Sequence, residues 1–272
     1  MVTTLIKHEA LRTRKWLAIV FGAATLLTMV GTLMAYTPWP IIRGLGFMLG
    51  LVAVSAFLFV VQLGLAYDYW RSSYSRTGYF THSLPVSGST IYGAKLLWGC
   101  IISVAALVWN LVLALPVVFA ASHIFDLGLT FSNLGDGLRS LLSAAPSWLW
   151  ATAAVLVLLW LFATVAQYYF AASIGSESKM NRYGIGGPIL VWVLLYVVMQ
   201  VVLFVGIIAI PLGVDLAPDG TPALVSTNFL ELMLNNEDAD LLPLGFLPVT
   251  FFVTGLLIWR TVVSWTKKVS LA

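Results

Sequence analysis

Residues 188–210, PILVWVLLYVVMQVVLFVGIIAI, form a stretch of 23 residues without a single charged side chain. A helix needs about 20 mostly apolar residues to cross the hydrocarbon core of a bilayer. Five other segments share this length and character. The sequence therefore predicts an all-α membrane protein, with residues 1–272 forming one transmembrane domain of six spans: 16–36, 44–66, 96–121, 148–172, 188–210 and 244–263.

The composition of the whole chain agrees with this prediction. Hydrophobic residues make up 60% of the chain, charged residues 9%, and the mean hydropathy is +0.97. A soluble domain carries about 25% charged residues, so this chain lacks the polar surface to cover a water-facing globule. Cys100 is the only cysteine, which excludes an internal disulfide and a cysteine metal cluster and is typical of a small buried side chain.

The basic residues orient the six predicted spans. If the N-terminus lies inside, only Arg43 and Arg139 fall outside, and 12 of the 14 basic residues fall on the cytoplasmic side. The sequence thus predicts a cytoplasmic-membrane protein with both termini inside, and topology explains the basic composition without a nucleic-acid partner. The inside residues are Lys7, Arg12, Arg14, Lys15, Arg71, Arg76, Lys95, Lys179, Arg182, Arg260, Lys267 and Lys268.

Residues 3–15, TTLIKHEALRTRK, precede the first span and predict a helix with Leu5, Ile6 and Leu11 opposite its basic residues. This pattern indicates an amphipathic helix at the membrane interface. An ordinary basic flank that only fixes the topology is the alternative.

The loops between the predicted spans contain turn and cap signals. In the longest cytoplasmic loop, 67–94, Pro85 predicts a break, after which Ser89 or Thr90 would cap the third span. In the outer loops, 134–142 and 226–234 predict short helices, the second after Pro/Gly/Asp turns. The acidic stretch 237–240 is typical of a solvated surface.

Motifs for catalysis, for nucleotides or for metals are missing from the sequence. Residues 88–95 depart from a phosphate-binding loop, and His8-Glu9 lacks the second histidine of a zinc protease. We therefore predict no catalytic, cofactor or metal site on this chain.

Four amide side chains lie within or near the spans and should face the interior of the bundle, because amides are costly in hydrocarbon. They line a transport path or form hydrogen bonds between helices: Gln62, Asn110, Gln167 and Gln200. Pro116 and Pro248 would kink their spans.

The loop before the third span carries the most specific motif. Residues 74–87, YSRTGYFTHSLPVS, continue to 92–97, YGAKLL. Together with the basic helix at 3–15 and six spans, this run resembles the membrane subunit, or permease, of bacterial ABC transporters of the type-2 class. In that class the loop forms a coupling helix that docks on an ATPase, so the resemblance implies these docking residues: Arg76, Thr77, Gly78, Tyr79, Phe80 and Thr81.

The same resemblance implies the remaining partners and the cargo. ATP and magnesium would bind a separate ATP-binding subunit, and a second permease, identical or related, would complete the conduit. The cargo would be an amphipathic drug, antibiotic or antimicrobial peptide, moved outward, and 226–234 would be a re-entrant or interfacial helix. The alternatives are a non-transporting membrane scaffold or immunity protein and a membrane-embedded enzyme acting on lipid or peptide.

Overall fold

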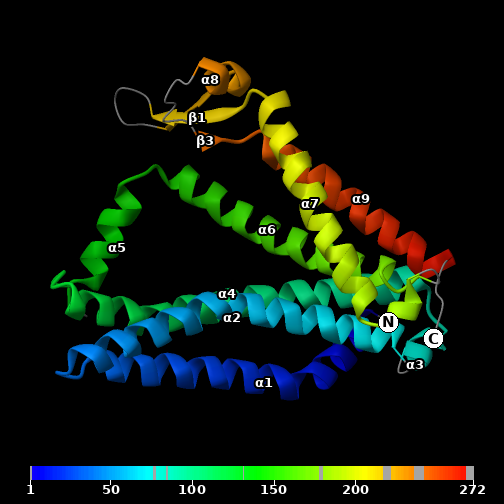
Figure 1. Ribbon diagram of the computed structural model, residues 1–272, viewed down its shortest axis with the longest axis horizontal. Coiled ribbons are helices and arrows are strands. Elements are labelled where there is room, and N and C mark those ends of the chain that lie inside the picture. Colours follow the sequence, from blue (N-terminus) through cyan, green and yellow to red (C-terminus); the bar gives the residue numbers. More distant parts are fainter. Residues whose placement is uncertain are drawn as a thin grey trace. The chain divides into compact units, whose positions relative to one another are not determined.

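The computed structural model describes residues 2–75, 78–83, 85–130, 132–177, 180–216, 222–235 and 242–267. Most of these residues are helical (Figure 1). The long helices are α1 (Val2–Ala35), α2 (Pro40–Tyr74), α4 (Gly88–Ile124), α6 (Ser147–Ile174), α7 (Gly186–Ala209) and α9 (Phe246–Lys267). Short elements connect them: α3 (Gly78–His82), α5 (Leu134–Ser143), the 3₁₀ turn η1 (Asn181–Tyr183) and α8 (Phe229–Asn235).

The six long helices are each long and apolar enough to cross a membrane, which confirms the predicted number of spans. Every predicted span falls on one of them and extends beyond it by no more than two residues, whereas α1, α2 and α4 continue well past the predicted spans. Large apolar side chains such as Leu33, Leu111 and Val201 are exposed along these helices. Lipid has to solvate such surfaces, so the chain is a multi-pass, all-α membrane protein.

The contacts within the chain divide it into two compact units. Unit 1 comprises residues 1–72 and 85–141, with α1, α2 and α4 as its long helices. Unit 2 comprises residues 73–84 and 142–272, with α3, α6, α7, α8 and α9. Each unit therefore contains three of the six candidate spans.

Small residues allow α1 and α2 of unit 1 to approach closely. A Cβ atom on Gly46 would lie 2.6 Å from the carbonyl oxygen of Gly31 and 2.7 Å from the backbone nitrogen of Ala35. Small residues four apart permit such backbone contact in membrane helices. Along the same unit, an apolar core includes Leu17, Phe57 and other side chains of α1, α2 and α4.

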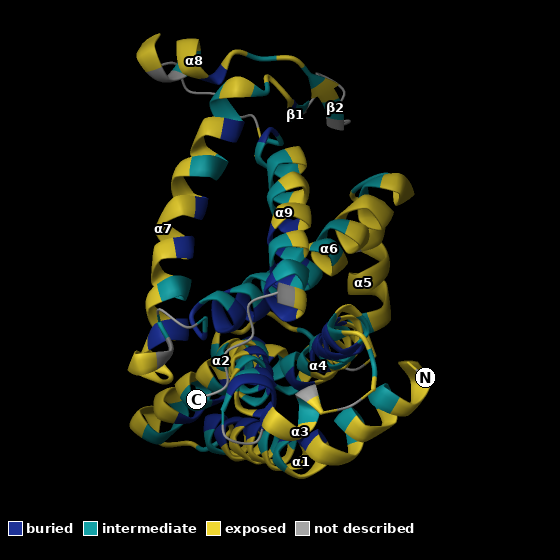
Figure 2. Cartoon of the chain, turned by 90° about the vertical axis from the view of Figure 1, so that its right-hand side faces the viewer, coloured by how far each residue is buried: buried dark blue, intermediate teal, exposed yellow. Residues whose placement is uncertain are grey.

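Unit 2 packs α6, α7 and α9 against one another. Its apolar core contains Leu195 and Met199 of α7 and Leu257 of α9. At the end of α7, a Cβ atom on Gly245 would lie 2.6 Å from the carbonyl oxygen of Gly206. Figure 2 shows buried positions on only one side of α7, and most of its other side chains are apolar and exposed or half-buried in this single chain.

A small antiparallel sheet follows α7, which the sequence did not predict. Its strand order is β2–β1–β3, with β1 (Gly213–Leu216) pairing Gly213 with Val225 of β2 (Pro222–Val225) and with Pro243 of β3 (Leu242–Pro243). Strands of two to four residues are too short to give a period-two signal. The buried Phe229 of α8 packs on β1, since a Cβ atom on Gly213 would lie 3.2 Å from its ring.

The predicted short helices are present, with one boundary moved. Residues 134–142 fall in α5, as predicted. The helix predicted at 226–234 begins at Phe229, three residues later than predicted, and ends at Asn235. The acidic stretch 237–240 lies outside the described residues.

Two local predictions around proline and serine were wrong. Ser87 caps α4, not Ser89 or Thr90, because the Ser87 hydroxyl accepts a hydrogen bond from the Thr90 backbone nitrogen at 3.4 Å. Pro248 lies in the first turn of α9, where a missing N–H breaks no helical hydrogen bond and no kink is required. Pro116 does lie inside α4.

Residues 3–15 are helical, as predicted, but they are continuous with the first span in α1. The separate helix is therefore not confirmed. The predicted apolar side also differs from the packed side, because Leu11 is exposed whereas Thr13 and Leu17 are buried. The polar contacts of this segment explain the difference.

Candidate functional site

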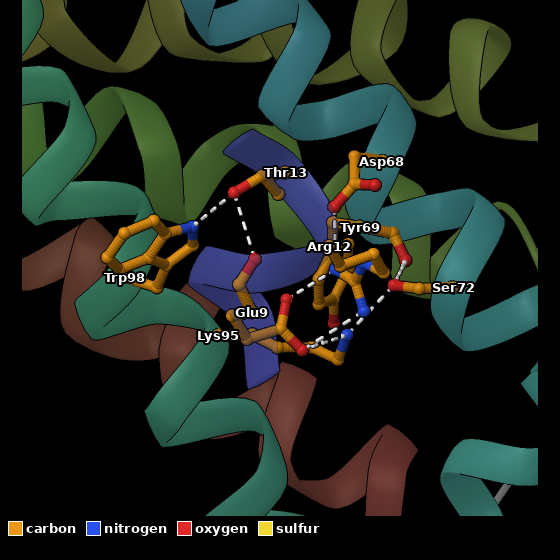
Figure 3. A network of polar contacts seen from close by, with 8 residues as sticks. All are labelled: Glu9, Arg12, Thr13, Asp68, Tyr69, Ser72, Lys95 and Trp98. Atoms are coloured by element: carbon orange, nitrogen blue, oxygen red, sulfur yellow. Dashed lines mark hydrogen bonds and ion pairs between the residues drawn. The ribbon is translucent and has the colours of Figure 1, made fainter. Parts of the chain in front are cut away.

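A buried lysine joins the three long helices of unit 1. Lys95 of α4 has only 3% of its side chain exposed. Its Nζ donates to Oε1 of Glu9 on α1 at 2.9 Å and to Oγ of Ser72 on α2 at 2.8 Å (Figure 3). Charged side chains are rarely buried unless they are paired, so these contacts make the position of Lys95 tolerable.

A second basic residue extends the contact from Glu9 to α2. The Arg12 guanidinium donates through Nη1 to Oε1 of Glu9 at 3.1 Å and through Nη2 to Oδ2 of Asp68 at 2.6 Å. Figure 3 shows Glu9 between the two basic groups. We call Glu9, Arg12, Asp68, Ser72 and Lys95 the charged network; its two acids and two bases balance.

Thr13 continues the polar contacts one residue further along α1. Its hydroxyl donates to the backbone oxygen of Glu9 at 2.9 Å and accepts from the indole Nε1 of Trp98 on α4 at 3.1 Å. Hydrogen bonds and ion pairs between side chains thus connect α1, α2 and α4. Such an arrangement holds helices together.

Sequence reasoning missed the charged network because it treated its basic members as topology signals. The three-residue spacing of Glu9 and Arg12 was a usable sign of an ion pair on one helix face. Their pairing with Asp68 and Lys95 spans 56 and 86 residues, respectively, and no local pattern encodes it.

The candidate docking residues lie on and before α3. Arg76 and Thr77 are outside the described residues, and Gly78 is buried at the start of the helix. Tyr79 and Phe80 follow, with 67% and 74% of their surfaces exposed. Their rings lie edge to face, with centroids 6.4 Å apart.

The remaining candidate, Thr81, is partly buried. In unit 2, the segment before α3 packs on the last turns of α9. The Tyr74 ring meets the Trp265 ring at a centroid distance of 5.8 Å and an angle of 63°. Both residues are buried. The two exposed aromatic rings of α3 therefore follow an anchored residue by five and six positions along the chain.

The four predicted amides do not form one lining within either unit. Gln62 and Asn110 belong to unit 1, whereas Gln167 and Gln200 belong to unit 2. Gln62 is 4% exposed, Asn110 and Gln167 are half-buried, and Gln200 is exposed on α7. Gln200 is therefore not buried within unit 2, and the inward orientation of the four amides stays a prediction.

Two of these amides have an unsatisfied group. Among the described residues, Nε2 of Gln62 and Oδ1 of Asn110 are buried without a hydrogen-bond partner. Whether these amides line a path stays a prediction.

The described residues contain no group of three or more metal-ligating side chains. No protein-family model, curated protein or solved structure matches this chain. Function must therefore be argued from the charged network, from α3 and from the resemblance of residues 74–97.

Proposed function

We propose that this chain is the permease subunit of an ATP-driven exporter of the ABC type-2 class, with both termini and α3 on the cytoplasmic side. The observation that carries the proposal is the exposed pair Tyr79 and Phe80 on a short helix between the second and third spans. Adjacent exposed aromatic side chains are typical anchors for a protein partner. The motif at residues 74–97 supports an ATP-binding subunit as that partner.

The contacts around α3 suit a role in transmitting movement. On one side, Tyr74 packs on Trp265 of α9 within unit 2. Along the chain, α2 ends two residues after Ser72, and α4 begins seven residues before Lys95. Ser72 and Lys95 both belong to the charged network, so the segment that carries α3 is joined to that network at both ends. A partner that moved α3 would therefore act on anchored helices rather than on a loose loop.

The chain itself would bind and conduct its cargo, and the partner would bind ATP and magnesium. A second permease, identical or related, would complete the conduit. An amphipathic drug, antibiotic or antimicrobial peptide is the proposed cargo, and this assignment rests on the resemblance alone.

Replacing the two exposed rings tests this proposal. We expect the double variant Tyr79→Ala/Phe80→Ala to insert normally but to lose its ATP-binding partner, because truncating buried aromatic anchors at an interface costs about 2 kcal/mol or more each. The wild-type chain, purified from its native membranes, should bring a stoichiometric ATP-binding subunit and vanadate-sensitive ATP hydrolysis.

The matched control is Trp39→Ala, which removes an exposed aromatic side chain from the predicted outer surface. This control should keep the partner and its activity. If the double variant retains a full complement of ATPase subunit and unchanged activity, α3 is not the docking helix.

A membrane scaffold or immunity protein is the second candidate. The exposed Gln200 and the division of the four amides between the units favour it, because no continuous polar lining is formed within either unit. A scaffold would use α3 in the same way but move nothing. Reconstituted vesicles separate the two: ATP-dependent uptake of a fluorescent amphipathic dye into inside-out vesicles supports the exporter, and partner binding without uptake supports the scaffold.

A further inference from the structure

A hollow of about 370 Å³ lies at the end of α4 in unit 1, and none of its lining residues belongs to the charged network. Tyr36, which follows α1, and Phe119 and His123, from the last turns of α4, supply aromatic rings to its lining. Asp126, in the loop that follows, supplies its only acidic side chain. The lining therefore combines aromatic surface with one carboxylate.

The conformation of Asp126 sets it apart from an ordinary surface acid. Its φ is 51°, in the left-handed region. The backbone nitrogen of Leu127 donates to the oxygen of Ser122 at 3.0 Å, which completes the helix-ending motif in which glycine usually occupies this position. Non-glycine residues held in this conformation cluster at functional sites, and here the retained side chain is a carboxylate.

Hydrogen bonds fix the loop that borders this open hollow. The backbone nitrogen of Leu129 donates to the Ser122 hydroxyl at 2.8 Å, which folds the loop back on the end of α4. Nδ2 of Asn133 donates to the oxygen of Gly128 at 2.8 Å. The walls are therefore formed before any ligand arrives, which lowers the cost of binding.

The charge in the hollow selects a cation. In the described part of the chain, the Asp126 carboxylate makes no ion pair or hydrogen bond, and Arg43 on α2 forms no ion pair with it. The hollow also lies at the C-terminal end of a long helix, where the helix dipole favours positive charge. Neither lysine nor arginine is among its described lining residues, and the imidazole of His123 is the basic group there.

The aromatic lining selects the kind of cation. The Tyr36 ring stacks on the His123 ring with centroids 4.9 Å apart and an angle of 27°. Aromatic surface beside a carboxylate suits a substituted ammonium group, because the alkyl groups contact the rings while the charge is attracted to the ring faces and to the acid. Among the described residues, no third metal-ligating side chain accompanies His123 and Asp126 to form a metal site.

We propose that this hollow binds the substituted ammonium group of a small organic cation. Two sources can supply that group: a dissolved amine and the headgroup of a lipid such as phosphatidylethanolamine. The proposal stands independently of the exporter assignment.

The test uses the full chain in nanodiscs of phosphatidylglycerol, which has no ammonium group, with benzyltrimethylammonium as the probe. The ring signals of the three histidines are followed by ¹⁵N NMR, and His123→Gln assigns the signal of His123. We expect a saturable shift of the His123 signal alone. Asp126→Asn should weaken the probe's affinity by about fivefold or more, as expected for the loss of an ionic contact.

Asp126→Gly separates binding from folding. Glycine suits the left-handed position, so this variant should be at least as heat-stable as the wild type while losing affinity to the same extent as Asp126→Asn. The control Asp136→Asn removes an exposed acid of α5 in the same unit and should bind the probe normally. Equal affinity in the wild type, Asp126→Asn and Asp126→Gly, or the lack of a saturable shift, would overturn the proposal.

A second arm identifies the source of the ammonium group. If a lipid headgroup occupies the hollow, nanodiscs of phosphatidylethanolamine should weaken probe binding by competition, and this competition should vanish in Asp126→Asn. If a dissolved amine is the occupant, the probe's affinity should be the same in both lipids. Either result supports the site, provided that the Asp126 variants lose affinity.

Discussion

Lys95 places a charged amine among three packed helices. Its hydrogen-bond and ion-pair partners determine whether this buried charge stabilises the fold. Lys95→Met keeps the apolar stem but removes the contacts with Glu9 and Ser72. We expect the free energy of unfolding to fall by about 1–3 kcal/mol, since buried polar groups lose a partner. Unfolding in mixed detergent micelles with increasing dodecyl sulfate, followed by circular dichroism, measures this change.

Arg139→Met is the matched control for Lys95→Met. Arg139 pairs with Asp136 at 3.8 Å, but 87% and 80% of their side chains are exposed. Such a pair contributes little to stability, so the control should unfold like the wild type. Equal destabilisation by both variants would mean that the charged network does not hold the helices of unit 1 together.

At the scale of residues, the sequence predicted the types of side chain but not their long-range partners. Lys95 was predicted to be a basic residue at the edge of a span, whereas its contact with Glu9 depends on how α1 and α4 pack. The cap of α4 was misplaced by two or three residues because Ser87, Ser89 and Thr90 are all good capping residues. The extended backbone at Ser87 and the hydrogen bond from the Thr90 backbone nitrogen to its hydroxyl distinguish among them.

At the scale of elements, the close contact between α1 and α2 depends on glycine residues, which have no side chain to separate the two backbones. Gly46→Ala would place a Cβ atom 2.6 Å from the oxygen of Gly31, so we expect the hairpin to separate locally and the free energy of unfolding to fall by about 1–3 kcal/mol. The same dodecyl sulfate titration measures the loss.

Gly22→Ala offers a control within α1. A Cβ atom there would meet nothing within 4 Å. The better helix propensity of alanine should stabilise this variant by up to about 1 kcal/mol. A Gly46→Ala variant as stable as Gly22→Ala would contradict close packing between α1 and α2.

The elements were predictable to the extent that they are long and apolar. All six long helices follow from hydropathy, whose signal accumulates over about 20 residues. The sheet around β1 was missed because its strands are short and its stability depends on Phe229 packing over Gly213. The start of α8 could not be predicted from a local pattern either. The extent of α1 was also missed, although no helix-breaking residue separates 3–15 from the first span.

At the scale of the whole molecule, the chain provides three candidate spans in each unit and exposes apolar surface along them. The proposed orientation rests on the distribution of 12 and 2 basic residues across the predicted topology. This orientation gives α3 access to cytoplasmic partners and puts the hollow at Asp126 on the outer side. The docking role of residues 76–81 stays a prediction from the motif, and the exposure of Tyr79 and Phe80 required the structure.

The most direct test of the exporter proposal is photo-crosslinking from α3. Phe80→p-benzoylphenylalanine places a photoreactive ring at an exposed position, and the same replacement at Trp39 serves as the control. After irradiation of native membranes, mass spectrometry and labelling with 8-azido-ATP identify the captured chain. We predict that position 80, but not position 39, crosslinks to an ATP-binding subunit. A correctly inserted chain that captures no ATP-binding subunit from position 80 would contradict the proposal.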